Sequence, residues 1–174
     1  MTAPTIAVIL LYIKRPEGLG GTMPLVAIVM GSKSDTEAMQ PARDTLDALG
    51  IEYEVKIISA HRKPETARQF GISARERGIE VIIAAAGGAA HLPGVLASWT
   101  TLPVIGVPLA GNELNGVDAL FSMAQMPAGI PVATVAIGSA GAKNSVYLAA
   151  EILGLKYDNI REAYDRFREK LKGA

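Results

Sequence analysis

From about Met23 onward, the hydrophobic residues alternate between short continuous runs and stripes at helical spacing. Five runs are candidate strands: Leu25–Met30, Tyr53–Ile58, Val81–Ala85, Val104–Val107 and Val132–Ile137. Continuous β-branched runs without regular polar positions are typical of strands that are covered on both faces. The alternation of such runs with helical segments therefore predicts a parallel sheet wrapped by helices.

Four segments carry the helical spacing: Asp35–Leu49, Pro64–Arg77, Ala142–Leu153 and Asn159–Lys172. In the first, Ser34 and Glu37 have the spacing of a capping box, and Gly50 stands where a C-cap is expected. Pro41 lies inside this segment, so we expect the helix to kink there or to start later. The second segment has proline at its favoured first position and Gly78 directly after it.

The last two helical segments differ in polarity. Ala142–Leu153 is apolar on nearly every face, which in a chain of this size indicates a helix at a subunit interface. The segment 159–172 has Ile160, Tyr164, Phe167 and Leu171 on one face, and Asn159 can cap its start. Its late Arg and Lys residues suit the negative end of the helix dipole.

Five parallel strands with intervening helices predict a three-layer αβα sandwich with flavodoxin-like strand order 2-1-3-4-5. In such sheets, ligands bind beyond the carboxyl ends of the strands, where the strand order switches between the first and third strands. The loops that follow the first three strands are therefore the candidate site.

The composition narrows the chemistry. The chain has 174 residues, no cysteine, two histidines, and 17 basic and 17 acidic residues. The lack of cysteine excludes a disulfide framework and Cys-based metal sites, and two histidines are too few for a His-rich metal site. Because the net charge is zero, we expect binding neither to nucleic acid nor to an anionic membrane.

Residues 1–22 stand apart from this pattern. Their apolar run Ile6–Ile13 is much shorter than the roughly 20 residues that span a bilayer, and it lacks signal-peptide features. The glycine-rich stretch 14–21 resembles a linker. We expect residues 1–22 to be an N-terminal extension, non-native or disordered, before one functional domain at 23–174; the alternative is an arm that packs on a neighbouring subunit.

The first candidate loop, 31–35, contains Ser32, Ser34 and Asp35. Two hydroxyls beside backbone N–H groups at a helix start can bind an anion, and the carboxylate could hold ribose hydroxyls. Taken alone, however, the loop is more simply a capped helix start. It matches neither the glycine-rich fingerprint of dinucleotide-binding proteins nor the phosphate-binding loop of nucleoside triphosphatases.

The second loop, 59–64, places Ser59, His61 and Arg62 at the carboxyl end of a strand. Arginine can bind a phosphate with two parallel hydrogen bonds, and histidine is the usual proton-transfer group. A lone histidine is often structural, so position alone leaves catalytic and structural roles for His61 equally open.

The third loop, 86–94, contains Gly87, Gly88 and His91. Its paired glycines and alanines let the backbone come close to a flat ligand. For His91 we favour a role behind the reacting group, or as a helix cap, over direct chemistry. A later segment, Gln125–Pro131, is on local grounds only a turn.

These four segments occur in a distinctive order: G-S-x-S-D, S-A-H-R, A-G-G-A-A-H-L-P-G and Q-M-P-x-G-x-P-V-A-T. From about Pro24 to Leu155, this order resembles the 5-(carboxyamino)imidazole ribonucleotide mutase family of de novo purine synthesis. Three departures from the family pattern, Thr36, Ala85 and Ala119, leave the S-A-H-R motif intact.

The resemblance implies a flavodoxin-like cytoplasmic homo-octamer that uses no metal and no cofactor and whose last helix, 159–172, packs on a neighbouring subunit. It implies His61 as the catalytic residue. It also implies a substrate-binding set, whose members are Ser32, Ser34, Asp35, Ser59, Arg62, Gly87, Gly88 and His91.

Two other functions remain to be weighed. The sister activity, 5-aminoimidazole ribonucleotide carboxylase, takes free carbon dioxide, and its family typically has lysine where Arg62 stands. A non-catalytic nucleotide-binding or signalling module on the same fold is weaker. A receiver-type module needs a cluster of acidic residues, and Asp35 has no acidic neighbours in its loop.

Overall fold

The predicted hydrophobic runs form one parallel sheet in the computed structural model, which describes residues 23–111 and 113–173. The strands are β1 (Val26–Met30), β2 (Tyr53–Ile57), β3 (Val81–Gly87), β4 (Val104–Leu109) and β5 (Ala133–Thr134). Their order is β2-β1-β3-β4-β5, which confirms the prediction. The prediction for residues 1–22 lies outside the described residues.

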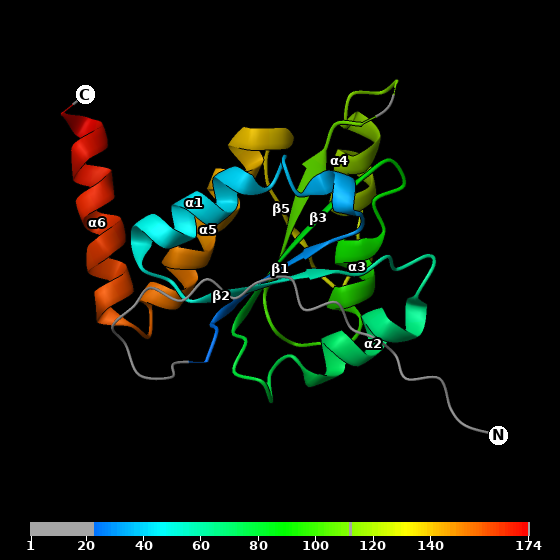
Figure 1. Ribbon diagram of the computed structural model, residues 1–174, viewed down its shortest axis with the longest axis horizontal. Helices are drawn as coiled ribbons and strands as arrows, with labels where there is room; N and C mark the ends of the chain where they lie inside the picture. The colour runs from blue at the N-terminus through cyan, green and yellow to red at the C-terminus, as the bar shows by residue number, and fades with distance from the viewer. Residues whose placement is uncertain (1–22, 112, 174) are drawn as a thin grey trace.

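Helices cover both faces of the sheet (Figure 1). They are the 3₁₀ turn η1 (Lys33–Asp35) and the helices α1 (Gln40–Leu49), α2 (Pro64–Ser73), α3 (Leu92–Ala97), α4 (Val117–Ala124), α5 (Gly138–Gly154) and α6 (Asp158–Lys172). One hydrophobic cluster joins the sheet to α1, α5 and α6, and the other joins it to α2, α3 and α4. The αβα sandwich is thus confirmed, and α3 and α4 are helices that the sequence pattern did not predict.

Strands β1, β3 and β4 are almost wholly buried, as the continuous apolar runs predict, whereas β2 is mostly half-buried. The fifth was predicted too long: the run Val132–Ile137 pairs with β4 only at Ala133 and Thr134. This strand lies at the edge of the sheet, and Pro131 before it has no N–H to donate to the ladder. After it, Gly138 adopts a left-handed conformation (φ 71°) as the chain enters α5.

Helix starts also differ from the prediction in detail. The capping box joins Ser32 and Asp35 around η1, so the predicted pair of Ser34 and Glu37 was wrong. Pro41 delays α1, which begins at Gln40 and not at Asp35, because proline is tolerated only in a first turn. Gly50 ends α1 in the left-handed conformation, as predicted.

The last helix starts differently as well. Tyr157, and not Asn159, holds the N-cap position of α6, and it makes no side-chain cap bond. The second helix ends at Ser73, four residues before Arg77, and turns continue to Gly78, which has φ 86°.

Helix α5 is apolar all round partly because it lies between the sheet and α6. Its inner face is buried against the sheet, while Tyr147 on its outer side stacks on Phe167 and Tyr164 of α6, with ring centroids 4.5 and 5.7 Å apart. The α5–α6 corner is tied to the start of β3, because Glu80 accepts hydrogen bonds from Lys156 and Tyr157. Much of the apolar surface that predicted an interface is therefore covered within the chain.

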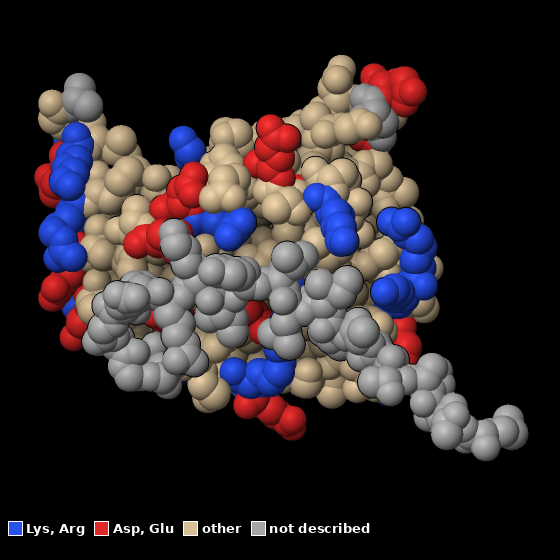
Figure 2. Space-filling model, in the orientation of Figure 1, with Lys and Arg blue, Asp and Glu red and all other residues tan. Residues whose placement is uncertain are grey.

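The surface agrees with the zero net charge. On the face that Figure 2 shows, Lys and Arg are interspersed with Asp and Glu and form no continuous basic area among the described residues. Within residues 23–111 and 113–173, no helix combines the length and hydropathy needed to cross a bilayer.

Gly141 gives a stability test of this packing. A Cβ at this position would overlap the carbonyl oxygen of Ala136, which belongs to the backbone and cannot move aside as a side chain can. We therefore expect Gly141→Ala to lower the free energy of unfolding by about 3 kcal/mol or more, as overpacking of a rigid contact does.

Chemical denaturation measures this change. The matched control is Lys143→Ala on the exposed face of the same helix, expected to alter stability by no more than about 0.5 kcal/mol. Equal stability of the two variants would contradict the close approach of α5 to residue 136.

Candidate active site

The loops after β1, β2, β3 and β4 enclose a cavity of about 360 Å³ at the carboxyl edge of the sheet. Every residue of the predicted site lines it: Ser32, Ser34, Asp35, Ser59, His61, Arg62, Gly87, Gly88 and His91. Segments up to 60 positions apart thus converge because the parallel strands that carry them end at one edge.

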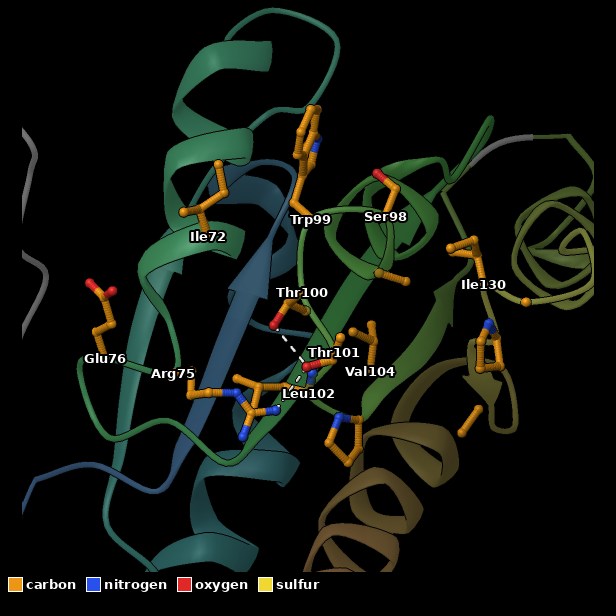
Figure 3. Close-up of a pocket in the computed structure, with 15 residues that line it drawn as sticks. Ile72, Arg75, Glu76, Ser98, Trp99, Thr100, Thr101, Leu102, Val104 and Ile130 are labelled. Atoms are coloured by element: carbon orange, nitrogen blue, oxygen red, sulfur yellow. Dashed lines mark hydrogen bonds between the residues drawn. The ribbon is translucent and has the colours of Figure 1, made fainter.

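A larger open hollow of about 870 Å³ lies at the opposite edge, around the amino ends of β4 and β5 (Figure 3). Two hydrogen bonds join groups of its lining: Arg75 donates to Thr101 at 2.9 Å, and the Leu102 N–H donates to Thr100 at 3.2 Å. Trp99 and Ile72 are partly exposed there. It holds none of the predicted residues, and ligands in such sheets bind at the carboxyl edge.

In the first loop, Asp35 is held by backbone and hydroxyl groups. The Ser32 N–H donates to Asp35 Oδ2 at 3.0 Å, and the Ser34 hydroxyl lies 2.9 Å from Ser32 Oγ and 3.3 Å from Asp35 Oδ1. Burial raises the pKa of the Asp35 carboxyl above its ordinary value, and these hydrogen bonds oppose the increase only in part. Further hydrogen bonds from a ligand would therefore stabilise the ionised carboxylate.

In the second loop, Ser59 fixes the position of Arg62. The Ser59 hydroxyl accepts hydrogen bonds from the backbone N–H of Arg62 at 3.3 Å and from its Nε at 3.2 Å. Among the described residues, the terminal nitrogens of this guanidinium make no other hydrogen bond or ion pair. Arg62 lines the cavity, and a guanidinium can bind phosphate oxygens through two parallel hydrogen bonds.

In the third loop, Gly87 and Gly88 have different structural roles. A Cβ at Gly87 would lie 3.0 Å from the carbonyl oxygen of Leu109, so glycine permits the close pairing of β3 and β4. Gly88 adopts φ 63°, a left-handed turn that carries the chain from β3 toward α3.

The two histidines form one unit. His61 Nε2 lies 2.8 Å from His91 Nδ1, and the rings meet edge to face with centroids 4.9 Å apart. Because one nitrogen of this pair must donate and the other accept, the tautomer of each ring depends on that of the other. His91 occupies the N-cap position of α3 but makes no side-chain cap bond, so it does not cap the helix, and its ring contacts His61 instead.

Sequence reasoning missed one wall of the cavity. Leu109, Ala110 and Gly111, at the end of β4, also line it. The prediction ended this strand at Val107 and considered only the loops after the first three strands. A parallel fourth strand ends at the same edge, which is the signal that could have found them.

The fourth motif, Gln125–Pro131, does not line the cavity, and Met126 instead contacts Gly94 in α3. Among residues 23–111 and 113–173, no group of three or more His, Asp or Glu side chains could hold a metal ion. The polar groups that converge here are hydroxyls, a guanidinium, a carboxylate and two imidazoles, a set suited to a phosphorylated ribose and a proton transfer.

Comparison with known proteins gives the family. The AIR carboxylase family model matches residues 25–174. The N5-carboxyaminoimidazole ribonucleotide mutases of Saccharolobus solfataricus and Pyrococcus horikoshii are 55% and 57% identical to the chain; each alignment covers 86% of it, and 94% and 83% of those proteins. The crystal structure of Treponema denticola PurE has a TM-score of 0.76 and 29% identity, covering 86% of this chain and 92% of that one.

The ordered motifs, the strand order and these matches agree with one another. The chain belongs to the AIR carboxylase family.

Proposed function

We propose that this protein is a 5-(carboxyamino)imidazole ribonucleotide mutase, an isomerase of de novo purine synthesis in which His61 relays the proton. The observation that carries the proposal is the His61–His91 pair at 2.8 Å inside a cavity that also holds Arg62, Asp35 and serine hydroxyls. The names of the relatives at 55–57% identity support the same activity.

The substrate would be held by groups suited to each of its parts. Arg62, with the hydroxyls of Ser32, Ser34 and Ser59, would bind the phosphate. Asp35 would accept hydrogen bonds from ribose hydroxyls. The backbone at Gly87 and Gly88 carries no side chain, so the flat imidazole ring could lie close against it.

The reaction moves a carboxylate within one molecule. The bond between the exocyclic nitrogen and the carboxylate carbon breaks, its electron pair stays on the nitrogen, and that nitrogen takes a proton. The ring carbon attacks the released carbon dioxide, forms a carbon–carbon bond and then loses its own proton. Because one proton is gained and one is lost, a single imidazole can serve both transfers.

Two features of the cavity would accelerate these steps. Proton transfer by a positioned side chain typically contributes roughly 10²–10⁴-fold. The glycine and alanine wall would keep carbon dioxide beside the ring, which replaces a bimolecular step by an intramolecular one. His91 would hold the His61 ring in one orientation and one tautomer.

The first test removes the imidazole. We expect His61→Asn to lower kcat for 5-(carboxyamino)imidazole ribonucleotide by about 10²–10⁴-fold while product binding stays within a few-fold. Turnover and calorimetric titration with the product measure the two effects. The matched control is Lys63→Ala, an exposed neighbour that does not line the cavity.

The same assay separates the alternatives. Turnover only of 5-aminoimidazole ribonucleotide with bicarbonate would indicate the carboxylase; Arg62, in place of the lysine typical of that family, and the names of the relatives favour the mutase. A non-catalytic binding module would leave the function of His61→Asn unchanged.

The second test concerns Asp35. Its pKa is raised in the folded state, so the folded protein binds this proton more tightly than the unfolded chain, and the ionised carboxylate opposes folding at neutral pH. Asparagine can still accept the Ser32 N–H. We therefore expect Asp35→Asn to keep or raise Tm at pH 7, with the difference vanishing below about pH 4.

Although Asp35→Asn should not destabilise the fold, it should weaken substrate binding. Loss of hydrogen bonds to a charged acceptor should raise KM by about 10- to 100-fold. Thermal melts at two pH values and steady-state kinetics measure both effects. A lower Tm with an unchanged KM would show that Asp35 is only a cap.

The proposal extends to a cytoplasmic homo-octamer that binds a small ribonucleotide, with α6 packing on a neighbouring subunit. Exposed apolar side chains support an assembly: Phe121 is 60% exposed on α4, and Leu171 is 56% exposed on α6. Light scattering should give a mass of about eight times 18.2 kDa. Leu171→Asp should reduce that mass, whereas a wild-type monomer at micromolar concentration would contradict the assembly.

A further inference from the structure

One motif has no place in the cavity. Gln125–Pro131 follows α4, and its Met126 is half-buried against the first turn of α3. A Cβ built at Gly94 would lie 2.9 Å from Met126 Sδ and 3.1 Å from its Cε, so the thioether rests directly on a residue without a side chain.

The first turn of α3 carries His91. Helix α3 has only six residues, and the His91 carbonyl accepts a hydrogen bond from the Val95 N–H at 2.9 Å. The other end of this short helix leads to Trp99, whose Cβ would be 2.7 Å from a Cβ at Gly71 in α2. Close contacts at glycine residues therefore hold α3 near both ends. Met126 makes the contact at the N-terminal end, which carries His91.

We infer that Met126 is a positioning residue that sets the first turn of α3, and through His91 the orientation of His61. The inference rests on the proposed function of His61 as the proton relay. A hydrogen bond of 2.8 Å weakens steeply with misalignment, so a shift of α3 by a fraction of an ångström changes how the two rings pair. Misplacement by about 1 Å can reduce a rate by as much as 10²-fold.

The residue types suit this role. Methionine is unbranched and fills irregular gaps, so its thioether can follow the surface of a helix. Glycine at position 94 leaves the space that the sulfur occupies. Because Met126 does not line the cavity, its contribution acts through α3 and not through contact with the substrate.

The test is a set of substitutions at the contact. We expect Met126→Ala and Gly94→Ala each to lower kcat about 10-fold with KM unchanged. Met126→Leu, which refills the gap, should stay within about 2-fold of wild type. The double variant Gly94→Ala/Met126→Ala should be more active than Met126→Ala alone, because the new methyl group takes part of the vacated space.

A second background isolates the route through His91. In His91→Phe, where the histidine pair is absent, Met126→Ala should cause no further loss of kcat. Imidazole ¹⁵N NMR of the folded protein should show altered His61 and His91 signals in Met126→Ala. The matched control is Ala128→Ser on the same loop, exposed and outside the motif positions, which should leave rate and spectra unchanged.

Three results would overturn the inference: an equal loss of kcat in the His91→Phe background, a rise in KM with kcat unchanged, or unaltered imidazole signals in Met126→Ala. The failure of the proposed function is a separate observation, namely full turnover by His61→Asn. The NMR comparison needs no substrate, so it tests the coupling even in that case.

Discussion

The common edge at which β1–β4 end is the constraint on which the rest of this molecule depends. Met30 pairs in register with Ile57 of β2 and with Ala85 of β3, and Gly87 pairs with Leu109 of β4. Parallel pairing alone places the following loops side by side, before any contact between the loops themselves is considered. The serines and Asp35, the S-A-H-R segment and the glycine loop converge for this reason.

Small residues make this convergence possible. Gly87 lets β4 approach to a distance that a Cβ would obstruct, and buried alanines in β3 keep the sheet close to α3. The cavity is therefore lined by small residues after β3 and β4 as well as by the polar loops after β1 and β2. A flat ligand between them would be in reach of the histidine pair and of Arg62, as the proposed carboxylate transfer requires.

The predicted elements differ from the structure mainly where one local sequence signal opposed another. Ser34 and Glu37 have capping-box spacing, but Ser32 and Asp35 form the box because Pro41 displaces the start of α1 and leaves a 3₁₀ turn after β1. The run 132–137 has strand composition, yet an edge position and a preceding proline leave only two paired residues. Helices α3 and α4 begin after glycine-containing segments and have only six and eight residues. Such short helices repeat the hydrophobic spacing too few times to be recognised.

The sequence by itself determined the layer architecture and the strand order, because buried parallel strands and amphipathic helices leave periodic patterns in the chain. It also determined the residues of the first three loops that line the cavity, since these loops follow predicted strands and their order resembles one family. Only the tertiary structure decided that His61 and His91, 30 positions apart, are hydrogen-bonded, and that Met126 rests on Gly94. Such contacts depend on the distances between packed elements, and no local pattern encodes these distances.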